Sequence, residues 1–342
     1  MIDVKISLPG EDSYSSFEKF IDPKNTIFQK INFHINNDVQ EADFWFVFED
    51  LYKNQEECLI NKKNIVYLNT ETSYPGSYFL NKHVKKYLEQ FQLQYGCYET
   101  FNINHTNTFP FLPWMINYET NSSVFSQTGK NVEELRNLNG IKKTKNISVI
   151  CSNKKITDNH IMRYEFTKKL KEYFGTDLDW YGVGENPIKS KWAGIKDYKY
   201  HIVIENGQKN NLISEKLFDS YLGLSFPIYF GAPNITEYFS KDSFATIDLN
   251  NFKDSVNTIE NIIQKNTYEN NIQNIYKSRD LVLGNYNFLN RLSKIIEHID
   301  YKENKYPKEK VVLNSVNEFW KMNTPLKRKV KHIVSRKLRL NN

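Results

Sequence analysis

Cysteine is scarce in this chain of 342 residues, and long apolar runs are missing altogether. The three cysteines, Cys58, Cys97 and Cys151, lie far apart, form no CxxC pair and have no zinc-site spacing. We therefore expect ordinary reduced thiols. No run of about 18 or more apolar residues occurs, and the first residues lack the basic start and apolar stretch of a signal peptide. These features predict a cytoplasmic protein.

Acidic residues are absent after Thr324, where the chain becomes strongly basic. The net charge of +6 therefore belongs to this last segment, and the rest of the chain is almost neutral. The apolar residues of the segment after Thr324 fall on one helical face. This pattern predicts a basic amphipathic helix that lies on the anionic inner face of the cell membrane. The residues predicted to contact the membrane are Lys327, Arg328, Lys329, Lys331, Arg336, Lys337 and Arg339.

Two other interpretations of the tail remain. It could pack on the body of the protein with its charges in solvent. It could also bind nucleic acid, but no base-reading motif accompanies the charge, so we predict no nucleic-acid partner.

The body of the chain has the composition of a globular protein, with 39% hydrophobic and 25% charged residues. Its length suits two domains. Three short apolar strands are predicted at Val4–Leu8, Asp43–Phe48 and Asn64–Leu68. Connections of a few tens of residues separate them, which is typical of βαβ units in a parallel sheet.

A second α/β series begins with the strand pattern at 146–153. A helix is predicted over 159–174, a buried strand over 200–206, a helix over 212–223 and a further strand from 226. We therefore predict an α/β fold with domains at 1–135 and 145–305, followed by the basic tail at 306–342. Ligands in such sheets bind beyond the carboxyl ends of the strands.

The most informative stretch lies at one of these strand ends. Glu205 and Asn206 close the strand, and Ser214, Glu215 and Lys216 stand where the next helix begins. A helix N-terminus offers unpaired N–H groups and a partial positive charge, so together with Lys216 it suits a diphosphate. Glu215 suits ribose hydroxyls. The alternative is that both residues simply occupy a solvated first helical turn.

A longer pattern surrounds these residues. It contains Ile204-Glu205-Asn206, then Ser214-Glu215-Lys216-Leu217, Pro227-Ile228-Tyr229-Phe230-Gly231, Pro233-Asn234 and Ser243-Phe244. In this order over about 55 residues, it resembles the C-terminal signature of the α-1,3-fucosyltransferases of glycosyltransferase family 10, as found in bacteria.

The resemblance implies a GT-B fold, with two Rossmann-like domains facing a cleft, and inverting transfer of fucose from GDP-fucose. It places Asn206, Glu215 and Lys216 at the donor, and Glu205 and Ser214 within the same donor-binding motif. It also implies a role for Arg163, which follows a strand ending in Ser-Asn. A guanidinium suits a pyrophosphate whose charge grows as GDP departs, and we expect Arg163 to be an exposed residue of the cleft.

The general base is expected on the other domain. Glu71 closes the third strand and resembles the strand-end glutamate of the family, so it is our candidate base for the acceptor hydroxyl. The rival carboxylates near another strand are Glu41, Asp43, Glu49 and Asp50.

A D-x-D pair at Asp177 and Asp179 is typical of metal-dependent sugar transferases, but "DWYG" resembles a structural turn of the family, so we interpret Asp179 as structural. We predict no metal or other cofactor for the chemistry. The expected partners are a GDP-sugar donor, a glycan acceptor such as a cell-surface polysaccharide or lipid-linked oligosaccharide, and the membrane. Leu212 stands where the family often has an aromatic residue, which leaves another GDP-linked sugar as an alternative donor. A second alternative, a non-catalytic glycan- or nucleotide-binding protein, gains if Glu71 is not the base.

Overall fold

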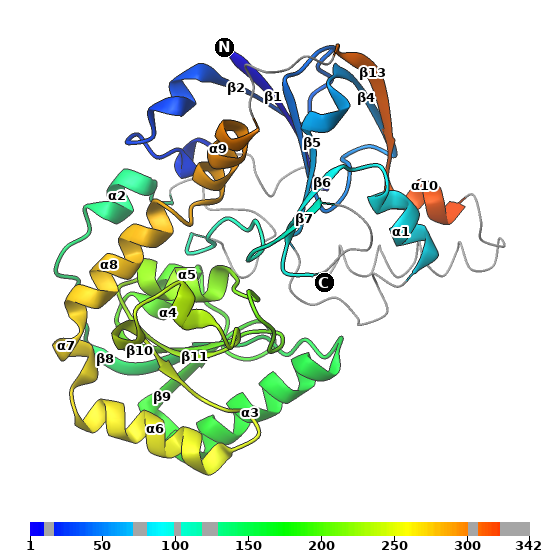
Figure 1. Ribbon diagram of the computed structural model, residues 1–342. Helices are drawn as coiled ribbons and strands as arrows, with labels where there is room; N and C mark the ends of the chain where they lie inside the picture. The colour runs from blue at the N-terminus through cyan, green and yellow to red at the C-terminus, as the bar shows by residue number, and fades with distance from the viewer. Residues whose placement is uncertain (10–16, 71–80, 99–103, 118–128, 300–306, 322–342) are drawn as a thin grey trace.

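Two β-sheets form the framework of the protein in the computed structural model (Figure 1). The structure describes residues 1–9, 17–70, 81–98, 104–117, 129–299 and 307–321. The first sheet has the strand order β2-β1-β3-β5-β6-β7 and the second has the order β12-β11-β10-β8-β9. Neighbouring strands in both sheets run parallel. The predicted α/β class is therefore confirmed.

The first sheet contains the three strands predicted from the N-terminal half. They are β1, β3 and β5, which lie side by side in its middle. All five residues of β3, with the sequence FWFVF, are buried, as expected for a parallel strand covered on both faces. The strands of this sheet are β1 (Ile2–Ser7), β2 (Ile31–Ile35), β3 (Phe44–Phe48), β5 (Ile65–Leu68), β6 (Leu93–Gly96) and β7 (Asn104–Asn107).

The second sheet is built around β10 and β11, which are apolar and almost wholly buried. Its strands are β8 (Lys145–Ile150), β9 (Leu178–Tyr181), β10 (Tyr198–Ile204), β11 (Phe226–Phe230) and β12 (Ala245–Thr246). Helices α3, α4, α5 and α6 are grouped around this sheet, and α7 and α8 continue from α6 (Figure 1).

The helices begin and end as follows: α1 (Lys82–Leu88), α2 (Val132–Arg136), α3 (Asp158–Phe174), α4 (Lys191–Ile195), α5 (Glu215–Leu222), α6 (Phe252–Gln264), α7 (Thr267–Asn270), α8 (Ile272–Leu283), α9 (Phe288–His298) and α10 (Val316–Lys321). Within the described ranges, none of them combines the length and the apolar character that a membrane-crossing helix needs.

After α8 the chain returns to the first sheet. This return comes before residue 305, where the second domain was predicted to end. The ring of Phe288 in α9 packs edge-on against Phe20 and Phe48, with centroids 5.2 and 6.2 Å apart. Residues predicted to start the tail form β13 (Glu309–Asn314), which pairs antiparallel with β4 (Gln55–Ile60). Alternation of buried Val311 and Leu313 with exposed neighbours explains this strand. The membrane-contacting residues predicted at 327–339 lie outside the described residues.

The carboxyl ends of the two sheets face each other. Asn107, the last residue of β7, accepts a hydrogen bond from the side chain of Asn211 in the loop that follows β10, at 2.9 Å. The connection between the sheets is held nearby, because the Arg291 guanidinium of α9 lies 3.7 Å from the ring centres of both Phe109 and Phe111. A ligand between the two domains would therefore meet the strand ends of both sheets.

Candidate active site

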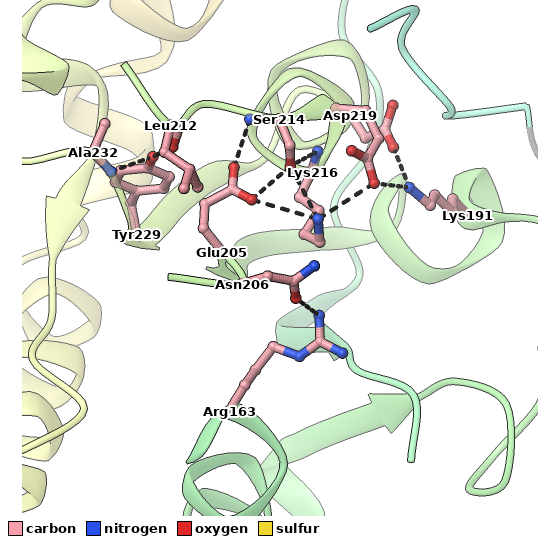
Figure 2. A network of polar contacts seen from close by, with 11 residues as sticks. Arg163, Lys191, Glu205, Asn206, Leu212, Ser214, Lys216, Asp219, Tyr229 and Ala232 are labelled. Atoms are coloured by element: carbon pink, nitrogen blue, oxygen red, sulfur yellow. Dashed lines mark hydrogen bonds and ion pairs between the residues drawn. The ribbon is translucent and has the colours of Figure 1, made fainter. Parts of the chain in front are cut away.

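The loop between β10 and α5, together with the first turn of α5, carries all the residues predicted to bind a donor except Arg163 (Figure 2). Glu205 and Asn206 directly follow Ile204, the last residue of β10, whereas the strand predicted over 200–206 included both. Helix α5 starts at Glu215, three residues later than the predicted start near Leu212, because Ser214 is its N-cap. The backbone of Ser214 is extended, with φ −112° and ψ −178°, and its Oγ accepts a hydrogen bond from the N–H of Lys216.

Glu205 supports this loop from inside the protein. Its side chain is buried, and its two oxygens accept hydrogen bonds from the backbone N–H of Ser214 at 2.7 Å and from the Ser214 hydroxyl at 2.6 Å. Asn206 points the other way, toward Arg163 (Figure 2). Of the predicted donor residues, Glu205 and Ser214 therefore bond to each other and shape the start of α5, whereas Asn206 faces the side from which α3 approaches.

Lys216 lies where the loop, the helix start and the buried carboxylates meet. Its Nζ is 3.0 Å from the Ser214 hydroxyl, 3.4 Å from Glu205 Oε2 and 3.5 Å from Glu215 Oε1. The side chain keeps 20% of its surface exposed. A charged ammonium is thus held at the N-terminus of α5, beside N–H groups that have no partner within the helix.

Two residues that the sequence analysis missed complete this charge cluster. Lys191 of α4 places its Nζ 2.9 Å from Asp219 Oδ2 and 3.3 Å from Glu215 Oε1. Asp219 in turn accepts a hydrogen bond from the backbone N–H of Met115, at 2.7 Å, in the segment that connects the two sheets. Glu215 and Asp219 are four residues apart on one helix face, and this spacing was the available signal that a buried cation would be needed.

The ionisation of these carboxylates follows from their positions. Burial would raise the pKa of Glu215, but the ammonium groups of Lys216 and Lys191 outweigh it and lower that pKa to about 2. Burial raises the pKa of Asp219 to about 6, although Lys191 opposes the shift. Burial also disfavours the charged form of Lys191, yet Asp219 and Glu215 outweigh it and raise the pKa. Glu215 and Lys191 are therefore charged near neutral pH.

Arg163 approaches the cluster from the second turn of α3. The sequence analysis treated it as an exposed cleft residue, but it is only 6% exposed, because α3 packs this face against the sheet. Its Nη1 donates a hydrogen bond to Asn206 Oδ1 at 2.7 Å. Its buried Nε–H has no hydrogen-bond partner within the described part of the chain. A buried guanidinium with an unused donor is costly unless a polar ligand supplies the missing acceptor.

The candidate base, Glu71, lies outside the described residues, but its rivals can be placed. Glu41 and Asp43 lie just before β3 and bind Lys308 Nζ at 2.7 and 2.9 Å. They belong to the amino end of the sheet, opposite the facing carboxyl ends. Glu49 follows β3 at the carboxyl end, where it accepts hydrogen bonds from the Asn69 side chain at 2.8 Å and from the backbone N–H of Thr70.

Asp50 and Asp179, two further acids named in the sequence analysis, are held by contacts with other parts of their own domains. Asp50 accepts hydrogen bonds from the backbone N–H groups of Leu51 and Val316, at 2.9 and 3.0 Å. Asp179 of β9 binds Lys145 Nζ at 2.8 Å and the Tyr198 hydroxyl at 2.6 Å. These contacts support the structural interpretation of Asp179.

Comparison with solved structures identifies the class of fold. A crystal structure of an α1,3-fucosyltransferase superposes with a TM-score of 0.51 and 19% sequence identity, over 80% of this chain and 80% of its own. At this identity the likeness concerns the fold alone. The protein has the GT-B fold, with two parallel α/β domains whose strand ends face each other.

Sequence comparisons match one part of the chain to a known family. Residues 141–278 match the model of the glycosyltransferase family 10 (fucosyltransferase) C-terminal domain, so the resemblance noted in the sequence is confirmed for this part of the chain. An α-(1,3)-fucosyltransferase of Helicobacter pylori is 31% identical over 83 residues, which are 24% of this chain and 17% of that protein. The match thus spans less than a fifth of that relative's length. The matched family domain contains Arg163, Lys191 and the whole loop from Glu205 to Lys216.

Proposed function

We propose that this protein is an inverting glycosyltransferase that moves fucose from GDP-fucose to a hydroxyl group of a glycan. One observation carries the proposal: within the stretch that matches the family 10 domain, a buried Arg163, whose Nε–H has no hydrogen-bond partner among the described residues, lies beside Asn206, and the Lys216 ammonium stands at the N-terminus of α5 nearby (Figure 2). Two cations and a helix N-terminus at a strand end form a site suited to a nucleotide diphosphate.

The residues of the site divide into two groups in this proposal. Arg163 and Lys216 bind the diphosphate, Asn206 orients the Arg163 guanidinium and contacts the donor, and Glu215 accepts hydrogen bonds from donor hydroxyl groups. Glu205 and Ser214 hold the loop in the conformation that exposes these donor-binding residues to the ligand. The hydrogen bonds between Glu205 and Ser214 support this role.

The reaction needs a base on the acceptor side and charge stabilisation on the donor side. The acceptor oxygen forms a bond to C1 of fucose, and its proton passes to the carboxylate of Glu71. The bond between C1 and the diphosphate oxygen breaks, and GDP leaves with the electron pair. Arg163 and Lys216 stabilise the negative charge that develops on the departing diphosphate. Because protein cations meet that charge, we propose that the chemistry requires no metal ion.

A donor screen tests the proposal. We expect GDP and GDP-fucose to raise the melting temperature of the protein, because both present the diphosphate to Arg163 and Lys216. UDP-sugars serve as the control, and GDP-mannose tests the alternative of another GDP-linked sugar. Turnover of GDP-fucose with and without glycan acceptors then separates an enzyme from a binding protein. Stabilisation by a UDP-sugar and not by GDP would overturn the assignment.

We also propose that the basic tail holds the enzyme at the inner face of the cell membrane, where a lipid-linked oligosaccharide or a cell-surface polysaccharide would be the acceptor. The basis is the sequence after Thr324, with seven basic residues around an apolar stripe and no acid. Each Lys or Arg near an anionic surface contributes about 1 kcal/mol.

Truncation after Asn323 is expected to release the protein from vesicles that contain phosphatidylserine, while transfer to a soluble acceptor continues. The fraction of full-length protein that sediments with these vesicles should fall as salt rises, because salt screens the attraction. Neutral vesicles are the control for apolar binding. If truncated and full-length chains sediment equally with anionic vesicles, the tail does not bind the membrane, and the alternative in which it packs on the body of the protein holds.

A further inference from the structure

Lys191 occupies a position that direct donor binding does not explain. Its ammonium is held between two carboxylates, Asp219 at 2.9 Å and Glu215 at 3.3 Å, and only 14% of the side chain is exposed. Removing a charged group from water costs free energy, so a buried charge suggests a role for the group that carries it. Figure 2 shows Lys191 on the side of the cluster away from Arg163.

The geometry points to that task. We propose that Lys191 is a positioning residue. Its ammonium neutralises part of the negative charge of Glu215, and this leaves Lys216 available for the donor diphosphate. One oxygen of Glu215, Oε1, is shared between Lys191 Nζ at 3.3 Å and Lys216 Nζ at 3.5 Å. The inference rests on the proposed function, because it assigns Lys216 to the diphosphate.

The charges around Lys216 show what the loss of Lys191 would do. Lys216 already has Glu205 Oε2 at 3.4 Å and Glu215 Oε1 at 3.5 Å. With Lys191 present, the negative charge of Glu215 is divided between two ammonium groups. Without it, both carboxylates act on Lys216 alone, and an incoming diphosphate meets a site that is one charge more negative. Donor affinity should fall although Lys191 does not contact the donor.

The same contacts fix Glu215 in space. Asp219 is anchored by the Met115 N–H of the segment between the two sheets, Lys191 is anchored by Asp219, and Glu215 is anchored by Lys191. The chain of contacts therefore runs from the connection between the domains to the first residue of α5. Glu215 is positioned for donor hydroxyls by a residue from a different helix, α4.

The test measures GDP binding by calorimetry in the full-length protein. Lys191→Met should weaken GDP binding about tenfold, the scale of losing one charged contact. The substitution leaves Asp219 buried without its cation, so the double variant Lys191→Met/Asp219→Asn is measured as well. The asparagine keeps an oxygen for the Met115 N–H and restores the net charge of the cluster, so we expect the double variant to recover stability. Its GDP affinity should stay low, because Glu215 Oε1 still has Lys216 as its only ammonium partner of the two. Lys145→Met is the control. It removes one positive charge at the amino end of β8 in the second sheet, and this variant should bind GDP normally.

Combination with Lys216→Ala shows whether Lys191 acts through Lys216. In that background, Lys191→Met should weaken GDP binding by no more than about twofold, because its target is gone. The inference is overturned if Lys191→Met and the double variant bind GDP like the parent, or if Lys191→Met is equally harmful in both backgrounds. These outcomes differ from failure of the proposed function, in which Lys216→Ala alone leaves GDP affinity unchanged.

Discussion

Alanine at position 163 is expected to weaken GDP binding by roughly tenfold to a hundredfold, since a hydrogen bond to a charged group contributes about 1.5–3 kcal/mol. The guanidinium is buried and donates to Asn206 at 2.7 Å, and no residue that the structure describes accepts a hydrogen bond from its Nε–H. The substitution removes both the charge offered to the diphosphate and the group that orients Asn206. Calorimetry with GDP and steady-state transfer from GDP-fucose measure the two consequences. The rate constant of transfer should also fall, because the lost contact strengthens as the diphosphate gains charge.

Lysine at the same position separates charge from geometry. Arg163→Lys keeps the positive charge, but one ammonium cannot reproduce the planar guanidinium, which donates to Asn206 and to a ligand from different nitrogens. We expect an intermediate affinity for GDP. Arg279→Ala is the matched control, because Arg279 is equally buried and donates to the Leu138 carbonyl, away from the loop after β10. It should lower stability and leave GDP affinity unchanged. Normal GDP binding by Arg163→Ala would show that the diphosphate lies elsewhere.

The parts of the fold that were predictable from sequence are those with local signals. Strands β1, β3, β5, β8, β10 and β11 are short apolar runs, and the sequence analysis placed the start of each within two residues of the observed start. The predicted end of β8 at 153 lies three residues beyond the observed end at Ile150. The loop from Glu205 to Lys216 was recognisable for the same reason, because its residues are neighbours in the chain. The late start of α5 was missed because it depends on the hydrogen bond between Ser214 and Lys216, which no periodicity of apolar residues reports.

The parts that escaped prediction depend on contacts between distant segments. Lys191 lies 24 residues before Glu215, and only the packing of α4 against α5 brings their charges to 3.3 Å. The burial of Arg163 was missed, because the position of a residue in a helix does not show which other segment covers it. The return of β13 to β4 joins segments more than 200 residues apart, and its alternating pattern does not reveal the partner strand.

Glutamine at position 71 is expected to slow transfer by about 10²- to 10⁴-fold, the range typical of losing general-base catalysis. Glutamine keeps the size and shape of glutamate but cannot take the acceptor proton. GDP affinity should be nearly unchanged, because the donor residues Arg163 and Lys216 belong to the other domain. The acidic limb of the rate–pH profile should disappear, since no carboxylate would need to lose its proton before the reaction. Steady-state kinetics over pH, together with calorimetry for GDP, test these expectations.

Glu49 provides the decisive comparison, because it is the rival at the carboxyl end of the first sheet. Its carboxylate accepts hydrogen bonds from the Asn69 side chain and the Thr70 N–H, immediately before Glu71, so it supports the strand end rather than standing apart from it. Both donors bond to Oε1, and the other oxygen, Oε2, accepts a hydrogen bond from the Tyr67 hydroxyl at 3.0 Å. In Glu49→Gln one of these two oxygens is replaced by an amide N–H₂, and we expect lower stability and a moderate loss of rate with the acidic limb retained. Loss of the acidic limb in Glu49→Gln, with near-normal turnover in Glu71→Gln, would transfer the role of base to Glu49. Glu41 and Asp43 do not enter this comparison, because Lys308 holds both at the opposite end of β3.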